Sequence, residues 1–171
     1  RTIYRLPMSL SFVVTATMWA WVYNARNGVL NQRLRAFNLE GAIVALLRPT
    51  GVNAEVIQWL SWNTTALAAV IFALIWQFSG YAMVVFLAGL QSLPDDQFEA
   101  ARVDGASTFK TYWRVIIPQL KSSSVSAAVI LLIFALKAFT FLYSMFGQYR
   151  VPQATDILAT LMVREAFQLQ N

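Results

Sequence analysis

The chain has 171 residues, of which 58% are hydrophobic and 12% are charged, and its formal net charge is +5. Soluble domains have about 25% charged residues, so this composition indicates a membrane protein. Cysteine and histidine are absent, which excludes disulfides, thiol nucleophiles, histidine zinc sites and a Ser-His-Asp triad. The basic residues are scattered through short polar segments instead of forming a stripe, so we expect no nucleic-acid partner.

Three apolar segments are predicted to span the membrane, because a transmembrane helix needs roughly 20 mostly apolar residues. In the first, Trp19, Trp21 and Tyr23 lie together at one end, as interfacial aromatic residues do. The second follows Asn63, a favourable cap residue, and has no charged side chain. The predicted spans are residues 7–23, 64–90 and 122–146.

The segment between the first two spans, residues 24–63, is predicted to lie at the membrane interface. It opens with an Asn-Gly turn and then places Leu30, Leu34 and Phe37 at helical spacing, which predicts an amphipathic helix. The apolar run at residues 41–47 is too short to span a bilayer. After the third span, polar and apolar residues alternate as in a surface helix.

The orientation of the spans is not decided by charge, since lysine and arginine occur equally often in the loops on the two sides. The chain starts at Arg1 without methionine and stops at Asn171 in a polar stretch. We therefore expect a fragment of a larger protein.

Residues 91–121 interrupt the apolar pattern with a charged, helix-forming segment. Ser92 stands where a helix cap is expected, and a proline and acidic residues follow, which predicts a helix over residues 94–103. Gly105 comes where that helix would close, because glycine adopts the left-handed conformation without penalty. Ser107 is expected to cap a second helix.

The second helix is expected to carry one apolar face, formed by Phe109, Tyr112, Trp113 and Ile116. About 30 residues with two capped helices exceed what a connection requires, so the segment is expected to bind a partner. The alternative is an ordinary solvated loop between two spans.

The loop resembles the EAA motif of permease subunits in bacterial binding-protein-dependent ABC importers. The matching positions are Glu99, Ala100, Ala101, Gly105 and Pro118, and Ile117 stands where leucine is customary. The sequence Asp104-Gly105-Ala106, and residues 87–94 before it, resemble the carbohydrate-uptake branch, which is related to the maltose permeases.

This resemblance implies an all-α, multi-pass permease of the bacterial inner membrane. Residues 91–121 would form a cytoplasmic coupling loop, and residues 24–63 and 147–171 would lie on the extracytoplasmic side. The first helix of the loop would sit in a cleft of an ATP-binding subunit, and the aromatic face of the second, with Phe109, Tyr112 and Trp113, would tie the loop back to the permease. The residues implied for ATPase coupling are Glu99, Ala100, Ala101, Asp104, Gly105 and Phe109.

The implied partners are a second permease subunit, two ATP-binding subunits, an extracytoplasmic solute-binding protein and the lipid bilayer. No phosphate-binding Gly-x-x-x-x-Gly-Lys-[Ser/Thr] motif occurs in the sequence. We therefore expect no catalytic residue, metal site or cofactor on this chain, with ATP and Mg²⁺ bound by the partner ATPase. The chain would be a transport subunit and not an enzyme.

A sugar pathway through the spans needs polar or aromatic groups inside apolar helices. The candidates are Gln77, Ser79 and Tyr81 in the second span, Lys137 in the third, and Tyr149 after it. Gln77 either lines the cavity or forms a helix-to-helix hydrogen bond. Lys137 either reaches the outer interface with its long side chain or stands at the outer mouth of the pathway.

The sequence therefore predicts a permease subunit that imports a mono-, di- or oligosaccharide by ATP-driven alternating access. One alternative is the same type of transporter for a polyol, a glycerol phosphate or another small solute. The other is a membrane scaffold that recruits a cytoplasmic protein without transport.

Overall fold

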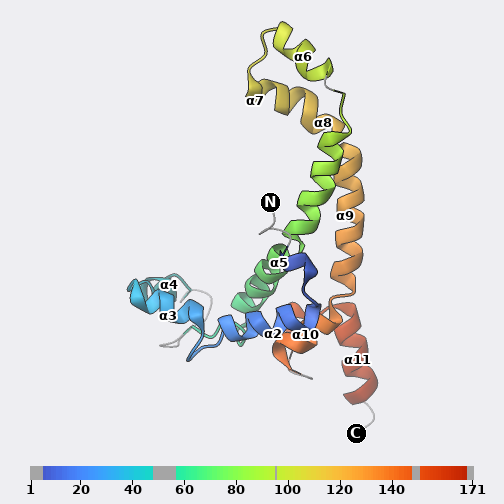
Figure 1. Cartoon of the computed structure of the whole chain (residues 1–171). Helices are drawn as coiled ribbons and strands as arrows, with labels where there is room; N and C mark the ends of the chain where they lie inside the picture. The colour runs from blue at the N-terminus through green and yellow to red at the C-terminus, as the bar shows by residue number, and fades with distance from the viewer. Residues whose placement is uncertain (1–5, 48–56, 95, 148–150, 169–171) are drawn as a thin grey trace. The chain divides into compact units, whose positions relative to one another are not determined.

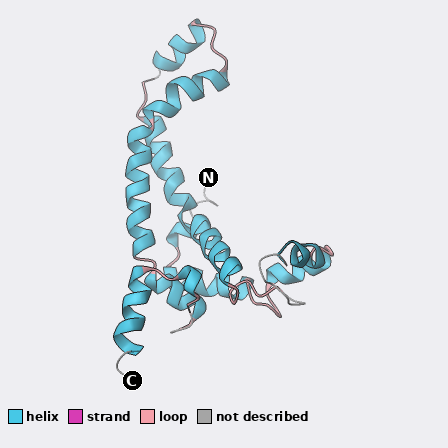
Figure 2. Ribbon diagram, turned by 180° about the vertical axis from the view of Figure 1, so that it is seen from behind, coloured by secondary structure: helices cyan, strands magenta, loops and turns pink. Residues whose placement is uncertain are grey.

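The computed structural model describes residues 6–47, 57–94, 96–147 and 151–168. Within these ranges the regular structure is helical, joined by turns and loops (Figures 1 and 2). The chain divides into two compact units, which we call the loop unit (residues 1–8 and 78–135) and the core unit (residues 9–77 and 136–171). The longest helix, α5 (Asn63–Gln91), contributes residues to both units.

The core unit contains the first part of α5 and the helices from both ends of the chain. These are α2 (Phe12–Val22), α3 (Val29–Ala36), α4 (Glu40–Leu47), α10 (Phe139–Phe146), the 3-10 turn η4 (Gln153–Thr155) and α11 (Leu158–Gln168). The loop unit contains the remainder of α5 and the charged segment. Its further elements are α6 (Asp96–Val103), α7 (Thr108–Thr111), the π turn η3 (Tyr112–Ile116), α8 (Ile117–Gln119) and α9 (Lys121–Leu136), and α1 (Leu6–Ser9) lies at its border.

The centre of the core unit is formed by bulky side chains of α10 that pack with alanines of α2 and α5. Phe141 and Leu142 are almost fully buried, and the Phe141 ring meets the ring of Phe12 edge to face at 6.4 Å. Ala16 and Ala73 are fully buried. Small residues let helix backbones approach closely, which is how helices associate in a membrane, where apolar area alone supplies little driving force.

The aromatic cluster at the end of α2 belongs largely to this core. Trp19 stacks on Tyr23 at 5.3 Å and meets Phe72 and Trp76 edge to face at 5.5 and 5.7 Å. The Tyr23 hydroxyl donates a hydrogen bond to the Ala69 carbonyl at 3.2 Å. Residues four apart share a helix face, and for Trp19 and Tyr23 that face is packed against α5. Only Trp21, on the opposite face, is 74% exposed. A position of the cluster at the membrane interface stays a prediction.

The amphipathic helix expected after the first span is present as α3. A buried residue that the sequence pattern did not single out, Asn31, holds it in place. The Asn31 amide nitrogen donates to the carbonyls of Ala25 and Ile57, both at 2.9 Å, and its oxygen accepts from the Trp59 indole at 2.8 Å. Phe37, expected on the apolar face, is 69% exposed.

The helices agree with the predicted spans at one of the three positions. α5 is the single described helix that is long and apolar enough to cross a membrane without a break. The first predicted span is divided by Leu10 and Ser11, which leaves the 11-residue helix α2. The third, residues 122–146, is divided into α9 and α10 at Lys137 and Ala138.

The break after α9 coincides with a change from exposed to buried residues. Ala138 and the apolar face of α10 are buried in the core unit, whereas Lys137 beside them is exposed. Residues 122–146 thus form two helices instead of one, and the predicted span with its membrane boundaries stays a prediction.

In the loop unit, α5 and α9 run side by side (Figures 1 and 2). The rings of Phe78 and Phe134 stack at 5.2 Å. Towards the loop, a side chain added at Gly89 would collide with the side chain of Ser123, so glycine permits the close approach of the two helices. The charged segment is thus attached to the ends of two closely packed helices.

Candidate functional site

The first helix of the charged segment, α6, exposes the beginning of the predicted motif. Glu99 and Ala100 are exposed, and Ala101 is buried on the opposite side. Asp96 and Glu99 lie in the first turn, where a carboxylate interacts favourably with the helix dipole. The expected cap at Ser92 is wrong, because its hydroxyl donates to the Gly89 carbonyl at 2.8 Å, in the last turn of α5.

The turn between the two helices has the conformation that glycine was expected to supply. Gly105 has a φ of +69°. The backbone N–H of Ala106 donates to the Ala101 carbonyl at 3.0 Å, five residues back, as in a Schellman motif. A Cβ at Gly105 would meet no atom within 4 Å. The requirement for glycine is therefore one of backbone conformation and not of space.

The second helical segment begins as predicted and then departs from the α-helix. The Ser107 hydroxyl accepts a hydrogen bond from the Lys110 N–H at 3.4 Å, which confirms it as the cap of α7. After α7, residues 112–116 form the π turn η3. Pro118 lies just beyond and has no N–H to offer the preceding turn, which favours a local change of winding. Short π turns occur frequently at functional sites.

The aromatic face of this segment is exposed within the described chain. Phe109 is 73% exposed, Trp113 58% and Tyr112 47%, whereas Thr111 and Ile116 are buried. Within the described chain, the contacts on the inner side are thus made by Thr111 and Ile116. The expectation that this face ties the loop to the permease stays a prediction.

Two glutamines that the sequence reasoning missed connect the ends of the site. The Gln119 amide on α8 donates to the Gln97 amide oxygen on α6. These residues are 22 positions apart, and neither belongs to a recognisable local pattern. They meet because the turn at Gly105 folds the second segment back towards the first.

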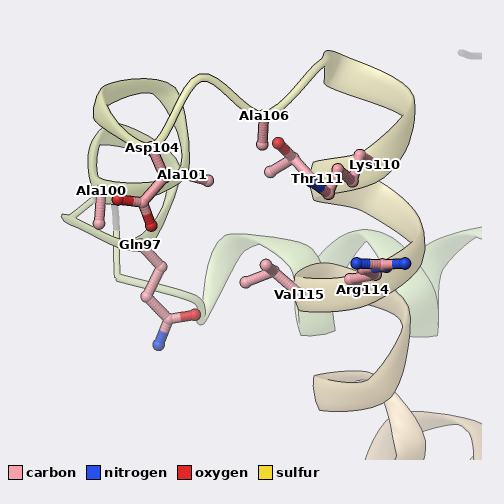
Figure 3. A pocket seen from close by; sticks show the side chains of 9 residues that line it. All are labelled: Gln97, Ala100, Ala101, Asp104, Ala106, Lys110, Thr111, Arg114 and Val115. Carbon is pink, nitrogen blue, oxygen red and sulfur yellow. The ribbon is translucent and has the colours of Figure 1, made fainter.

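A pocket of about 380 Å³ lies between α6 and the second segment (Figure 3). Asp104 and Gln97 line it on one side, and Lys110 and Arg114 line it on the other. Its walls therefore present a carboxylate and an amide opposite two cations. The remaining lining residues are Ala100, Ala101, Ala106, Thr111 and Val115.

The predicted coupling residues occupy three different positions. Ala100, Ala101 and Asp104 line the pocket. Gly105 forms the turn. Glu99 and Phe109 are exposed and are not among the residues that line this pocket. The motif thus presents one charged group and one aromatic group outwards, on two different helices.

Of the predicted pathway residues, Gln77 has the clearest environment. It is 4% exposed, and its Nε2 donates to the Leu10 carbonyl at 3.2 Å. Leu10 lies in the break between α1 and α2, where the Ser11 hydroxyl, and not the Leu10 carbonyl, accepts from the Val14 N–H. Gln77 therefore binds the backbone between α1 and α2, and both of its predicted roles, in a cavity or in a helix-to-helix hydrogen bond, stay predictions. Its Oε1 is buried without a hydrogen-bond partner.

The other predicted pathway residues are dispersed. Ser79 and Tyr81 are half-buried on α5 in the loop unit. Lys137 is exposed at the break between α9 and α10 in the core unit. Tyr149 lies outside the described residues. A role for these residues in a substrate pathway stays a prediction.

Several known proteins have sequences similar to that of this chain. A xylose/arabinose import permease protein of Haloferax volcanii is 60% identical over 98% of this chain and 48% of its own length. An osmoprotective compounds uptake permease protein of Synechocystis is 32% identical over 100% of this chain and 57% of its own length. The chain spans about half the length of the curated relatives it matches.

The fold is also found among solved structures. A bacterial ABC transporter involved in the import of the acidic polysaccharide alginate superimposes with a TM-score of 0.71 at 22% identity, over 99% of this chain and 54% of that one. The family model for the binding-protein-dependent transport system inner membrane component matches residues 1–163. This match covers nearly the whole chain, including the two-helix loop, and the chain therefore belongs to the family of inner membrane components of binding-protein-dependent transport systems.

Proposed function

We propose that the chain is part of the permease subunit of an ATP-driven importer that carries a sugar into the cytoplasm by alternating access. The observation that carries this proposal is the family match over residues 1–163, which includes the outward-facing motif of α6. The similarity to a xylose/arabinose import permease supports a sugar as the cargo. The permease would cross the inner membrane several times.

The loop would transmit movement from a separate ATPase. The exposed Glu99 makes the charged contact with that subunit, and the exposed Ala100 beside it permits close approach. The Gln97–Gln119 hydrogen bond and the Gly105 turn keep α6 at a set angle to the second segment. A displacement of α6 therefore passes to α5 and α9, the helices on either side of the loop in the chain, as a rigid-body movement.

The proposed assembly contains a second permease subunit, two ATP-binding subunits and an extracytoplasmic solute-binding protein. The family description, a binding-protein-dependent transport system, supports the last of these. ATP and Mg²⁺ bind to the ATPase. Ligand binding and the ATP cycle then act on this chain by favouring one of its two access states.

A second candidate cargo is a small non-sugar solute, such as a polyol or a glycerol phosphate. The similarity to an osmoprotective compounds uptake permease supports a non-sugar solute as this second candidate. Uptake of radiolabelled xylose and of glycerol 3-phosphate into proteoliposomes that contain the complete transporter separates the two. Uptake of neither solute, with a complex that assembles normally, would favour the scaffold role.

The coupling role of Glu99 is tested by Glu99→Ala in the same proteoliposomes. Because Glu99 is exposed, we expect unchanged assembly and thermal stability. Solute uptake per ATP hydrolysed should fall roughly fivefold or more, the usual size of a coupling between sites. Glu165→Ala, which removes an exposed carboxylate from α11 in the core unit, is the matched control. Normal uptake by the Glu99→Ala transporter would contradict the proposed contact.

A further inference from the structure

An exposed apolar line runs along the second segment of the loop. We call Phe109, Trp113 and Ile117 the apolar stripe; they are 73%, 58% and 46% exposed. The first two rings are 6.1 Å apart. Over four residues an α-helix drifts by about 40°. The π turn at residues 112–116 has more residues per turn and counters this drift, so the three side chains stay close to one line.

Cations border the apolar stripe. Lys110 follows Phe109 and Arg114 follows Trp113, and both cations are exposed, while each also lines the pocket that Asp104 lines from the other side. No ion pair is recorded for either of them within the described ranges. Lys121, also exposed, begins α9 immediately beyond the segment. An apolar line with Trp and Phe, edged by Lys and Arg, is the pattern of a helix that lies in the membrane interface.

The angle of the segment agrees with this position. Residues 108–119 meet α9 at 59°. Transmembrane helices tilt by about 0–40° from the bilayer normal. With α9 tilted by about 30°, the segment would lie in the membrane plane. The segment and α9 therefore meet at an angle that suits an interfacial helix followed by a transmembrane helix.

We propose that the apolar stripe lies in the headgroup region of the membrane, with Lys110 and Arg114 on anionic lipid phosphates. This contact would hold the second segment at a constant depth while α6 faces the ATPase. The proposal rests on the membrane location of the family, and only its choice of the cytoplasmic leaflet rests on the proposed function. A lipid surface explains both the apolar residues and their basic border, whereas a protein partner would have to supply an acidic rim as well.

The test measures the depth of single labels in the complete transporter. Because this chain has no cysteine, a nitroxide can be attached at Phe109→Cys or Trp113→Cys once cysteines elsewhere in the complex are replaced. Val103→Cys, at an apolar residue that is 87% exposed on α6, is the matched control. Nanodiscs contain phosphatidylcholine with or without phosphatidylglycerol, and accessibility to oxygen and to a nickel chelate is compared.

We expect labels at residues 109 and 113 to be more accessible to oxygen than to the nickel chelate, as in lipid, and the label at residue 103 to lack this preference. Preferential access of the chelate to residues 109 and 113 would place the stripe in water and overturn the proposal. Protection of both labels from both reagents would show a protein contact and would overturn it too. Two labelled positions guard against misfolding of one variant.

The role of the cations has its own measurement. The double variant Lys110→Glu with Arg114→Glu should lower the oxygen preference of the Trp113→Cys label in nanodiscs with phosphatidylglycerol, and much less in phosphatidylcholine alone. Equal behaviour in the two lipids would overturn the anionic-lipid contact. These depth measurements need no transport, so their failure is distinguishable from failure of the coupling role of Glu99.

Discussion

In the core unit Phe141, Leu142 and Met145 are almost fully buried, whereas in the loop unit Phe109 and Trp113 are mostly exposed. The core unit is held together by close packing of aromatic side chains on alanines. The charged segment of the loop unit instead depends on a helix cap, a glycine turn and one amide pair. The apolar side chains of α10 therefore stabilise the core unit, whereas the exposed apolar side chains of the loop are free to contact a surface outside this chain.

The largest expected effect is on the core. Phe141→Ala should lower the free energy of unfolding by about 3–5 kcal/mol, because it removes a fully buried ring and leaves a cavity. Phe37→Ala, at a ring that is 69% exposed, should change it by no more than about 0.5 kcal/mol. Chemical unfolding of the detergent-solubilised complex measures both. Similar changes in the free energy of unfolding for the two variants would contradict the assignment of one ring as buried and the other as exposed.

A smaller effect is expected where α5 and α9 pack in the loop unit. Gly89→Ala should destabilise by about 1–3 kcal/mol, because the new Cβ collides with the Ser123 side chain. Adding Ser123→Gly removes that collision and should restore part of the loss. Gly41→Ala, where a Cβ meets nothing within 4 Å, is the control and should be neutral or stabilising. Absence of rescue in the double variant would contradict the close approach.

The smallest effect on stability, and the most specific one on function, is expected at the turn. Gly105→Val should cost about 1–2 kcal/mol, since φ is positive and the substituent is β-branched. Gly105→Asn should cost less, because asparagine tolerates this conformation. Uptake per ATP hydrolysed should fall in the valine variant and be largely kept in the asparagine variant.

The control for the turn is a glycine with a similar constraint in the other unit. Gly147 has a φ of +79°, and a Cβ there would also meet nothing within 4 Å. Gly147→Val should therefore lower stability while the ratio of uptake to ATP hydrolysis is unchanged. A loss of coupling as large as that of Gly105→Val would show that backbone strain in either unit impairs transport. The coupling defect would then not be specific to the loop.

Several parts of the site were predictable because their causes are local. The Ser107 cap and the Gly105 turn depend on residues a few positions away, so the sequence pattern was sufficient to place them. The Gln97–Gln119 pair was not predictable, since its partners are separated by the whole turn. The π turn and the break at Lys137 were not predictable either, because an apolar pattern does not distinguish a continuous helix from a bent one.

Composition, the long apolar segment of α5 and the EAA-like motif by themselves determined the membrane class, the helix–turn–helix form of the loop and the family. Only the tertiary structure decided which face of each helix is covered. Trp19 and Trp113 are the same residue type in apolar helical patterns, but the first packs against α5 and the second is 58% exposed. The physical reason is that helical periodicity defines a face, whereas burial of that face requires another element to be brought against it.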